Sequence, residues 1–71
     1  ARVKDVYSNG QVLFEDKHFQ DHIEHHVPVQ IYYQNCHKDI GFVERYTPSF
    51  IKVNRTYYYR HVYTFISRPG Y

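Results

Sequence analysis

The sequence has few of the residues that stabilise a small domain by cross-linking it. Its 71 residues include a single cysteine, Cys36, and neither Trp nor Met. One cysteine excludes a disulfide within the chain. A domain of this length buries only about 60% of the surface that its unfolded chain exposes, so such domains often depend on disulfides, metals or partner subunits. We therefore expect a metal site or self-association to stabilise the fold.

Long apolar runs and a strong charge of one sign are also absent. No run approaches the roughly 18 apolar residues of a membrane span, and no signal-peptide core is recognisable. The formal net charge is +2, with both signs scattered along the chain, so bulk attraction to nucleic acid or to anionic membranes is weak. The sequence predicts a protein with no membrane partner, located in the cytoplasm or in an intracellular assembly.

Apolar strand-forming residues dominate the chain from Val27 to Pro69. This region reads VPVQIYYQN, DIGFVERY, SFIKV and TYYYRHVYTFIS, with short polar breaks. Such blocks are typical of short antiparallel strands. Gly41 lies inside one of them and predicts a sharp bend, as the corner of a small barrel requires. The expected fold class is mainly β, with a small, strongly bent antiparallel β-barrel over residues 27–69.

Residues 1–15 predict a β-hairpin ahead of that sheet. RVKDVYS and QVLFE flank Asn9-Gly10, which is the strongest sequence signal for a two-residue type I′ turn. Pairing across this turn places Tyr7 opposite Val12, Val6 opposite Leu13 and Lys4 opposite Glu15.

Residues 16–26 predict a short helix within the same single domain of residues 1–71. Phe19 and Ile23 are four residues apart among polar residues, which is the spacing of an amphipathic helix. Asp16 is the expected N-cap, and Pro28 ends the helical pattern. A helix this short is not stable alone in water, so Phe19 and Ile23 are expected to pack on the sheet.

The order of these elements resembles that of the Sm and Hfq family of small β-barrels. Asn35 and Gly41 fit the family's first signature, and Tyr59-Arg60-His61 is similar to the Tyr-Lys-His of Hfq. Cys36 and Thr47 depart from the first signature, where the family has Gly and Asp. The cadence of the last strands and the abundant Tyr also resemble Sm-like spore-coat proteins of the GerQ type. The resemblance implies an Sm-like or SH3-like barrel that forms oligomers and, as in Hfq, an RNA-binding ring.

Aromatic and basic residues alternate near the C-terminus and support two interpretations. Single-stranded RNA is bound by rings that stack on bases and by Arg side chains that contact phosphate. The candidate RNA-binding residues are Arg55, Tyr59, Arg60 and His61. Alternatively, this is a strand whose Tyr side chains face the core and a neighbouring subunit, with Tyr58 and Tyr63 near the contact. In that case Arg60 pairs with a carboxylate such as Glu44 or Asp39.

Histidines cluster in and after the expected helix, at positions 18, 22, 25 and 26. Their spacing places His18, His22 and one of His25 or His26 on one helical face, and imidazole is a ligand for zinc, copper or nickel. The candidate ligands are His18, His22 and His26, with Cys36 or His37 as a distant fourth. The alternative is a solvated face opposite Phe19 and Ile23, and no resident cofactor is expected.

Two function classes remain open from the sequence alone. Cys36 and His37 are adjacent, which does not position a base for a nucleophile, so we do not expect an enzyme. The first class is a self-assembling structural or interaction module, of the kind found in a spore coat, whose partner is a second copy of itself. It would associate through unpaired edges of the strand over residues 49–53 and of the strand ending near Ile66. The second class is an RNA-binding ring. The scattered lysines favour the first class.

Overall fold

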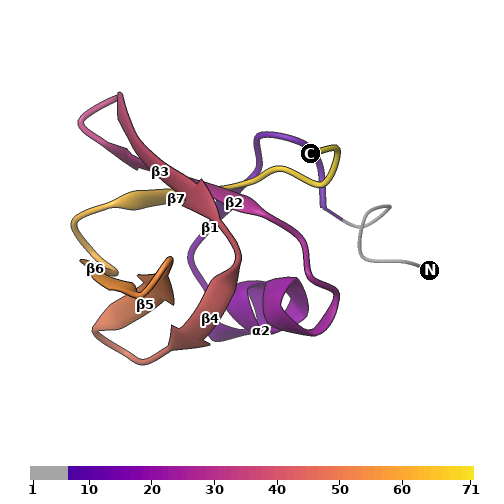
Figure 1. Ribbon diagram of the computed structural model, residues 1–71, viewed down its shortest axis with the longest axis horizontal. Helices are drawn as coiled ribbons and strands as arrows, with labels where there is room; N and C mark the ends of the chain where they lie inside the picture. The colour runs from indigo at the N-terminus through magenta and orange to yellow at the C-terminus, as the bar shows by residue number, and fades with distance from the viewer. Residues whose placement is uncertain (1–6) are drawn as a thin grey trace.

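A computed structural model describes residues 7–71 of the chain (Figure 1). It contains one helix and seven strands in this part of the chain. In chain order they are β1 (Val12–Leu13), α2 (Asp16–Glu24), β2 (Val29–Tyr33), β3 (Cys36–Gly41), β4 (Val43–Tyr46), β5 (Phe50–Val53), β6 (Thr56–Tyr59) and β7 (Thr64–Ser67). No helix among these residues is long and apolar enough to cross a membrane.

The strands form two antiparallel sheets. Sheet A has the order β1-β7-β2-β3, and sheet B has the order β4-β5-β6. The chain passes from sheet A to sheet B at the bend between β3 and β4 (Figure 1). The mainly β class with one short helix and antiparallel strands is confirmed. Among the described strands the hydrogen-bonded ladders form two separate sheets, and no closed barrel is found.

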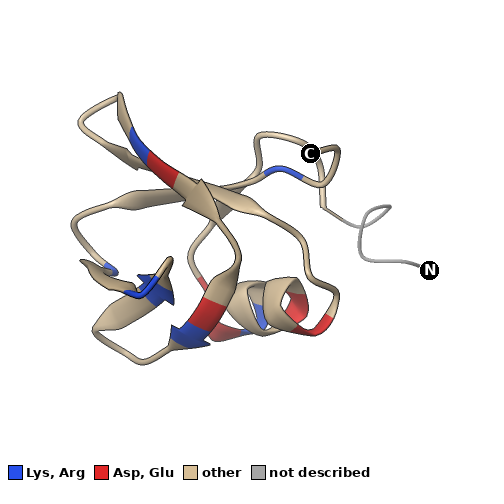
Figure 2. Cartoon of the chain, viewed as in Figure 1, with Lys and Arg blue, Asp and Glu red and all other residues tan. Residues whose placement is uncertain are grey.

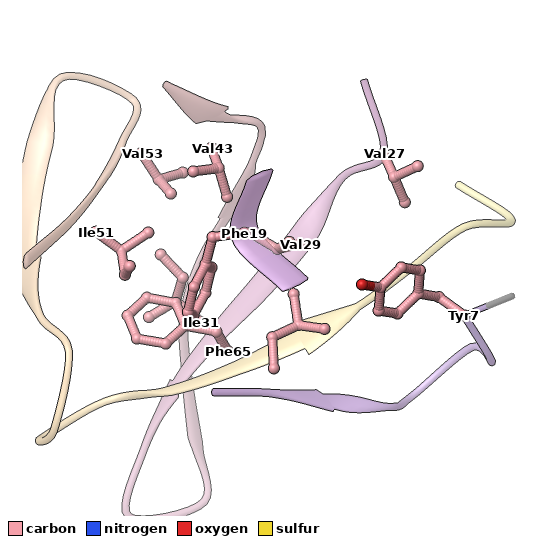
Figure 3. Close-up of a cluster of buried hydrophobic side chains, with 10 residues drawn as sticks. Tyr7, Phe19, Val27, Val29, Ile31, Val43, Ile51, Val53 and Phe65 are labelled. Carbon is pink, nitrogen blue, oxygen red and sulfur yellow. The ribbon is translucent and has the colours of Figure 1, made fainter. Parts of the chain in front are cut away.

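The core lies between the two sheets and the helix (Figure 3). Val27, Val29 and Ile31 are 0–1% exposed, and Val29 and Ile31 alternate with the half-buried Gln30 and Tyr32. They meet Ile51 and Val53 of sheet B and the aromatic side chains of Phe19 and Phe65, whose rings contact edge to face with centroids 5.6 Å apart. Burial of a side chain of this kind contributes about 1.5–3 kcal/mol.

Histidines lie at both ends of helix α2 and help to set its bounds. Its N-cap is Glu15, one residue earlier than predicted, because the Glu15 backbone N–H donates to Nδ1 of His18 at 3.2 Å. At the other end His26 has φ 54°, and a left-handed residue stops helical hydrogen bonding before Pro28. The prediction that Phe19 packs on the sheet is confirmed, since it is fully buried.

The segment before the helix pairs with the C-terminal strand. Val12 is opposite Ile66 and Leu13 is opposite Phe65. Gly10 has φ 94° while Asn9 is not left-handed, so the turn is not the predicted type I′ turn, which requires positive φ at both positions. The part of the predicted first strand that contains Lys4 and Val6 lies outside the described residues. Tyr7, predicted to lie opposite Val12, is described but is not in a strand, and Val12 is paired with Ile66 instead.

Two tight turns follow the sequence signals and one turn does not. Asn54-Arg55 joins β5 to β6 with φ 51° and 63°, and Gln34-Asn35 joins β2 to β3 with φ 48° and 67°. The block TYYYRHVYTFIS, in contrast, contains two strands, because residues 60–63 form a turn in which Tyr59 C=O accepts from the N–H groups of Val62 and Tyr63.

Gly41 lies at the predicted bend, where β3 ends, and the reason for a glycine there is space. A Cβ atom built on Gly41 would lie 2.7 Å from Oδ1 and 2.8 Å from Nδ2 of Asn54. Asn54 cannot move away easily, because its Nδ2 donates to Asp39 Oδ1 and to Ile40 C=O, each at 2.9 Å. Gly41 does not have positive φ, so crowding and not backbone conformation selects glycine.

Gly41→Val is therefore expected to lower the free energy of unfolding by about 1–3 kcal/mol, because it displaces the Asn54 side chain from both acceptors. Urea denaturation followed by far-UV circular dichroism measures the loss. Gly70→Val is the matched control, since a Cβ at Gly70 meets nothing within 4 Å. Equal denaturation midpoints for the two variants would show that Asn54 is not held in place.

Candidate interaction surface

The outer side of sheet B carries a cluster of aromatic side chains. Along β5 and β6 the side chains alternate, so that Ile51 and Val53 are buried while Phe50, Tyr57 and Tyr59 point away from the core. The ring centroid of Phe50 is 4.8 Å from that of Tyr59 and 5.9 Å from that of Tyr57. Tyr57 and Tyr59 are 50% and 59% exposed. We call these three residues the aromatic face.

Basic side chains border the aromatic face. Lys52 is directly opposite Tyr57 in the β5–β6 ladder, and its Nζ lies 5.3 Å from the centre of the Tyr57 ring. Arg45 is opposite Lys52 in the β4–β5 ladder, so it is on the same side of the sheet. One carboxylate, Glu44, lies 3.9 Å from Lys52. Figure 2 shows acidic and basic positions on β4 and a basic position on β5.

Strand β6 is an edge strand without the usual protection against pairing. Natural edge strands are shielded by charges, prolines, bulges or extreme shortness. Among the described edge strands, β3 and β4 carry charged residues and an irregular register, and β1 has two residues. The residues of β6 are Thr-Tyr-Tyr-Tyr, in regular register with β5. The open edge of β6 and the aromatic face adjoin.

The two strands predicted to offer free edges are both paired within the chain, so that prediction is wrong. β5 lies between β4 and β6. β7 lies between β1 and β2. The capping of β7 continues into Ser67, whose N–H donates to Gln11 C=O and whose C=O accepts from the Gly10 N–H, both at 2.8 Å.

Tyr58 and Tyr63, the predicted self-association residues, are half-buried and pack against the core of their own chain. Their ring centroids are 5.1 Å apart, and Tyr58 Oη donates to Asp39 Oδ2 at 2.7 Å. Burial and this hydrogen bond to the Asp39 carboxylate raise the pKa of Tyr58 to about 12. The exposed tyrosines of β6 are therefore its other two, Tyr57 and Tyr59.

The Asp39 side chain links β3 of sheet A to Tyr58 of β6 in sheet B. Burial alone would raise the pKa of Asp39, but hydrogen bonds from Tyr58 Oη, the Ile40 N–H and Asn54 Nδ2 stabilise the carboxylate and lower it. This network, and not a ligand site, explains the acidic residue at this position.

Arg60 is placed where it cannot act as the predicted phosphate contact, since its side chain is only 8% exposed. Its Nη1 lies 2.6 Å from Asp16 Oδ1 and donates to Thr47 C=O at 2.9 Å. Its Nη2 donates to Phe14 C=O at 3.1 Å. The carboxylate that pairs with Arg60 is therefore that of Asp16, and not that of Glu44 or Asp39 as predicted. Of the other candidate RNA-binding residues, Tyr59, Arg55 and His61 remain exposed.

The three candidate metal ligands do not converge. His18 Nδ1 accepts from the N–H groups of Phe14 and Glu15. His26 packs on the ring of Phe42, with centroids 4.1 Å apart. Within residues 7–71 no group of three or more His, Cys, Asp or Glu side chains is arranged to hold a metal ion.

His22 is fully buried, contrary to the expectation of a solvated helix face. Its Nδ1 lies 2.7 Å from His18 C=O, and its Nε2 lies 2.7 Å from Ser67 Oγ. Because a carbonyl only accepts, the neutral ring carries its proton on Nδ1, and Ser67 Oγ donates to Nε2. The pair has the spacing of a nucleophile and its base, but both side chains are 0% exposed, so no substrate reaches them and the contact is structural.

Tyr7 contacts helix α2 next to the His22–Ser67 pair. Tyr7 packs edge to face on His22 with centroids 4.5 Å apart, and Tyr7 Oη donates to Asp21 Oδ2 at 2.8 Å. Burial and the Asp21 carboxylate raise the pKa of Tyr7 to about 12. Cys36 is exposed at the start of β3, and His37 contacts the Tyr32 ring.

Comparisons of the chain with protein-family models, with curated proteins and with solved structures found no match.

Proposed function

We propose that this protein is an interaction module that associates with further copies of itself through sheet B. The observation that carries the proposal is the free edge of β6, which has neither charge, proline nor bulge and adjoins the exposed aromatic face. Exposed edges of this composition pair readily with other strands. Tyr is also enriched in protein interfaces, since its ring adds apolar area while its hydroxyl keeps a hydrogen-bond partner.

The strand order supports an Sm-like or SH3-like barrel as the scaffold of this module. Reading across the two sheets, β7, β2, β3, β4, β5 and β6 follow one another, with the bend at Gly41 joining β3 to β4. The order along the chain, with a helix before the first long strand and then a strand that bends at Gly41, is the one that the Sm-like resemblance implies. β1 is an addition that covers β7.

Tyr57→Glu is expected to weaken self-association at least tenfold, which corresponds to about 1.4 kcal/mol. The new carboxylate faces Lys52 within the chain, so folding is retained, but a copy that pairs along β6 meets a like charge. Sedimentation equilibrium at micromolar concentrations measures the change.

Val12→Glu is the matched control for this experiment, because Val12 is 48% exposed, close to the 50% of Tyr57, and lies in sheet A. It is expected to leave association unchanged. A wild-type chain that sediments only as the 8.7 kDa monomer would overturn the proposed function.

A second candidate function is binding of single-stranded nucleic acid on the aromatic face. It is favoured by the three aromatic rings that lie on one side of sheet B together with Lys52 and Arg45. Rings of this kind stack on bases, and the adjoining cations contact phosphates. In this form the candidate keeps Tyr59 and Arg55 and omits Arg60.

Tyr59→Ala is expected to weaken binding of a uridine- or adenosine-rich oligonucleotide by about 1–3 kcal/mol, the contribution of one stacked base. Fluorescence anisotropy at physiological salt measures it. Tyr71→Ala is the control, because Tyr71 is 70% exposed and the C-terminus lies apart from sheet B (Figure 1). Wild-type binding weaker than millimolar would remove this candidate.

A further inference from the structure

The symmetry of self-association follows from which strand edges are open. A ring built by head-to-tail strand pairing needs two different free edges on each copy, one at each end of the sheet. β6 offers one such edge, but β1 covers β7 from Phe65 to Ser67. The outer edges of β1, β3 and β4 are short, charged or irregular in register. A copy that pairs through β6 therefore finds its best complement in the β6 of another copy.

The backbone groups that β6 presents can be assigned from its pairing with β5. The Arg60 N–H donates to Ser49 C=O at 2.9 Å, and hydrogen-bonded pairs alternate with non-hydrogen-bonded pairs along an antiparallel ladder. Counting back from this bond, Thr56 and Tyr58 direct their backbone groups toward β5. Tyr57 and Tyr59, opposite Lys52 and Phe50, direct theirs toward the open edge.

These outward groups leave few arrangements for a partner strand. Tyr59 C=O already accepts from the N–H groups of Val62 and Tyr63 at 3.2 and 3.1 Å. Within residues 7–71, the outward groups of β6 that lack a backbone partner are therefore the N–H and C=O of Tyr57 and the N–H of Tyr59. An antiparallel copy of β6 satisfies both groups of Tyr57 if Tyr57 pairs with Tyr57 of the second copy. If Tyr57 pairs with Tyr59 of the second copy instead, Tyr57 C=O accepts from the Tyr59 N–H, but the Tyr57 N–H faces a carbonyl that already accepts two hydrogen bonds.

We propose that two copies of this chain pair antiparallel along β6, forming a two-fold dimer with a continuous six-stranded sheet. Either register places the two-fold axis within one residue of Tyr57. The proposal rests on the proposed function, because it specifies the partner and symmetry of that same edge. β6 carries no charged side chain, so the two copies approach without repulsion between the paired strands, and the two aromatic faces become one surface.

Single-cysteine cross-linking tests the symmetry. In the Cys36→Ser background, Tyr57→Cys places a thiol beside the axis, so a short bis-maleimide is expected to link it to the same position of the second copy. Val12→Cys, on β1 and equally exposed, is the matched control and should cross-link several-fold less. Thr56→Cys provides a second position in β6 that leaves both exposed tyrosines intact. Sedimentation of each variant before cross-linking gives its mass.

The outcomes separate this inference from the proposed function. Cross-linked dimers at positions 56 and 57 but not at position 12, with a sedimenting dimer, support the two-fold pairing. Oligomers larger than a dimer would overturn the two-fold pairing but not self-association. A dimer in sedimentation that cross-links no better at positions 56 and 57 than at position 12 would do the same. A monomer of every variant and of the wild type overturns both.

Discussion

Arg60→Ala is expected to lower the free energy of unfolding by about 2–4 kcal/mol, far more than removal of an exposed cation. The guanidinium links the start of the helix to the segment after β4, since it contacts Asp16, Phe14 C=O just before the helix and Thr47 C=O. Its Cζ also lies 4.9 Å from the centre of the Phe19 ring. Alanine leaves two carbonyl groups without a donor and opens one side of Phe19.

The two bonds to carbonyl groups and the contact with the Phe19 ring contribute most of this loss, and the ion pair with Asp16 contributes less. The Asp16 side chain is 70% exposed, so water replaces Arg60 around its carboxylate at little cost. Arg60→Lys is expected to recover only part of the loss, because an ammonium lacks the planar fork that reaches Asp16 and both carbonyls together.

Urea denaturation followed by far-UV circular dichroism measures the effect. It is best done in the Tyr57→Glu background, where changes in self-association do not contribute to the apparent stability. Arg45→Ala is the control, since Arg45 is exposed on sheet B, and it should change stability by no more than about 0.5 kcal/mol. If Arg60→Ala matches this control and instead abolishes oligonucleotide binding, Arg60 contacts nucleic acid and does not stabilise the fold through Asp16, Phe14 and Thr47.

The strands were predictable because their signals are local. Alternation of Val29 and Ile31 with Gln30 and Tyr32 requires only a period of two, and Asn54-Arg55 supplies the left-handed residues of a tight turn. The turn at residues 60–63 was missed because it contains neither Gly, Pro, Asn nor Asp. Its backbone bonds to Tyr59 C=O replace the usual turn residues.

The roles of the polar residues were harder to predict, because they depend on partners far away in the sequence. His22 reads as one more polar position of an amphipathic helix, and its burial depends on Ser67, 45 residues later. Arg60 follows three tyrosines, a pattern typical of an exposed cation, and the carboxylate that it contacts belongs to Asp16 of the helix. A sequence pattern carries no information on which of several acids reaches a given base.

The sequence predicted the kind of surface that associates, but not which strand forms it. A Tyr-rich strand with an open edge was expected, and β6 has both properties. The edges themselves were misassigned, because the pairing of Val12 and Leu13 with β7 uses a segment of two strand residues that was expected to pair within an N-terminal hairpin. Alternation also distinguishes Tyr57 and Tyr59 from Tyr58 only once the register with β5 is known.

His22 also makes the stability of the fold sensitive to acid. Burial of the ring lowers the pKa of His22 below its ordinary value of 6.5, although its bond to His18 C=O and the Asp21 carboxylate favour the charged form. The groups that face the ring are Ser67 Oγ, the Tyr7 ring and the His18 backbone. None of these is an anion that would balance a buried imidazolium.

The direction of the pH dependence follows from this lowered pKa. Below pH 6.5 the unfolded chain takes up a proton at His22 while the folded chain does not, so stability falls as the pH drops from 6.5 to the folded pKa. The slope reaches at most about 1.4 kcal/mol per pH unit for one group. The pKa of Asp21 is lowered by the hydrogen bond from Tyr7 and by Lys17, and that of Asp39 is lowered too, so their stabilisation is lost only below about pH 4.

Between pH 7.5 and pH 5 the melting temperature of the wild type is therefore expected to fall, by about 4–8 °C for each 1 kcal/mol lost. The His22→Gln variant should have a lower melting temperature than the wild type at pH 7.5, because Ser67 Oγ and His18 C=O lose the ring nitrogens that they contact. The melting temperature of this variant should depend much less on pH across the same range. His61→Gln, at an exposed position, leaves the buried ring intact and should keep the wild-type slope. A His22→Gln variant with the full wild-type slope would show that the acid sensitivity arises at another group, since the titration of a buried imidazole cannot persist after its removal.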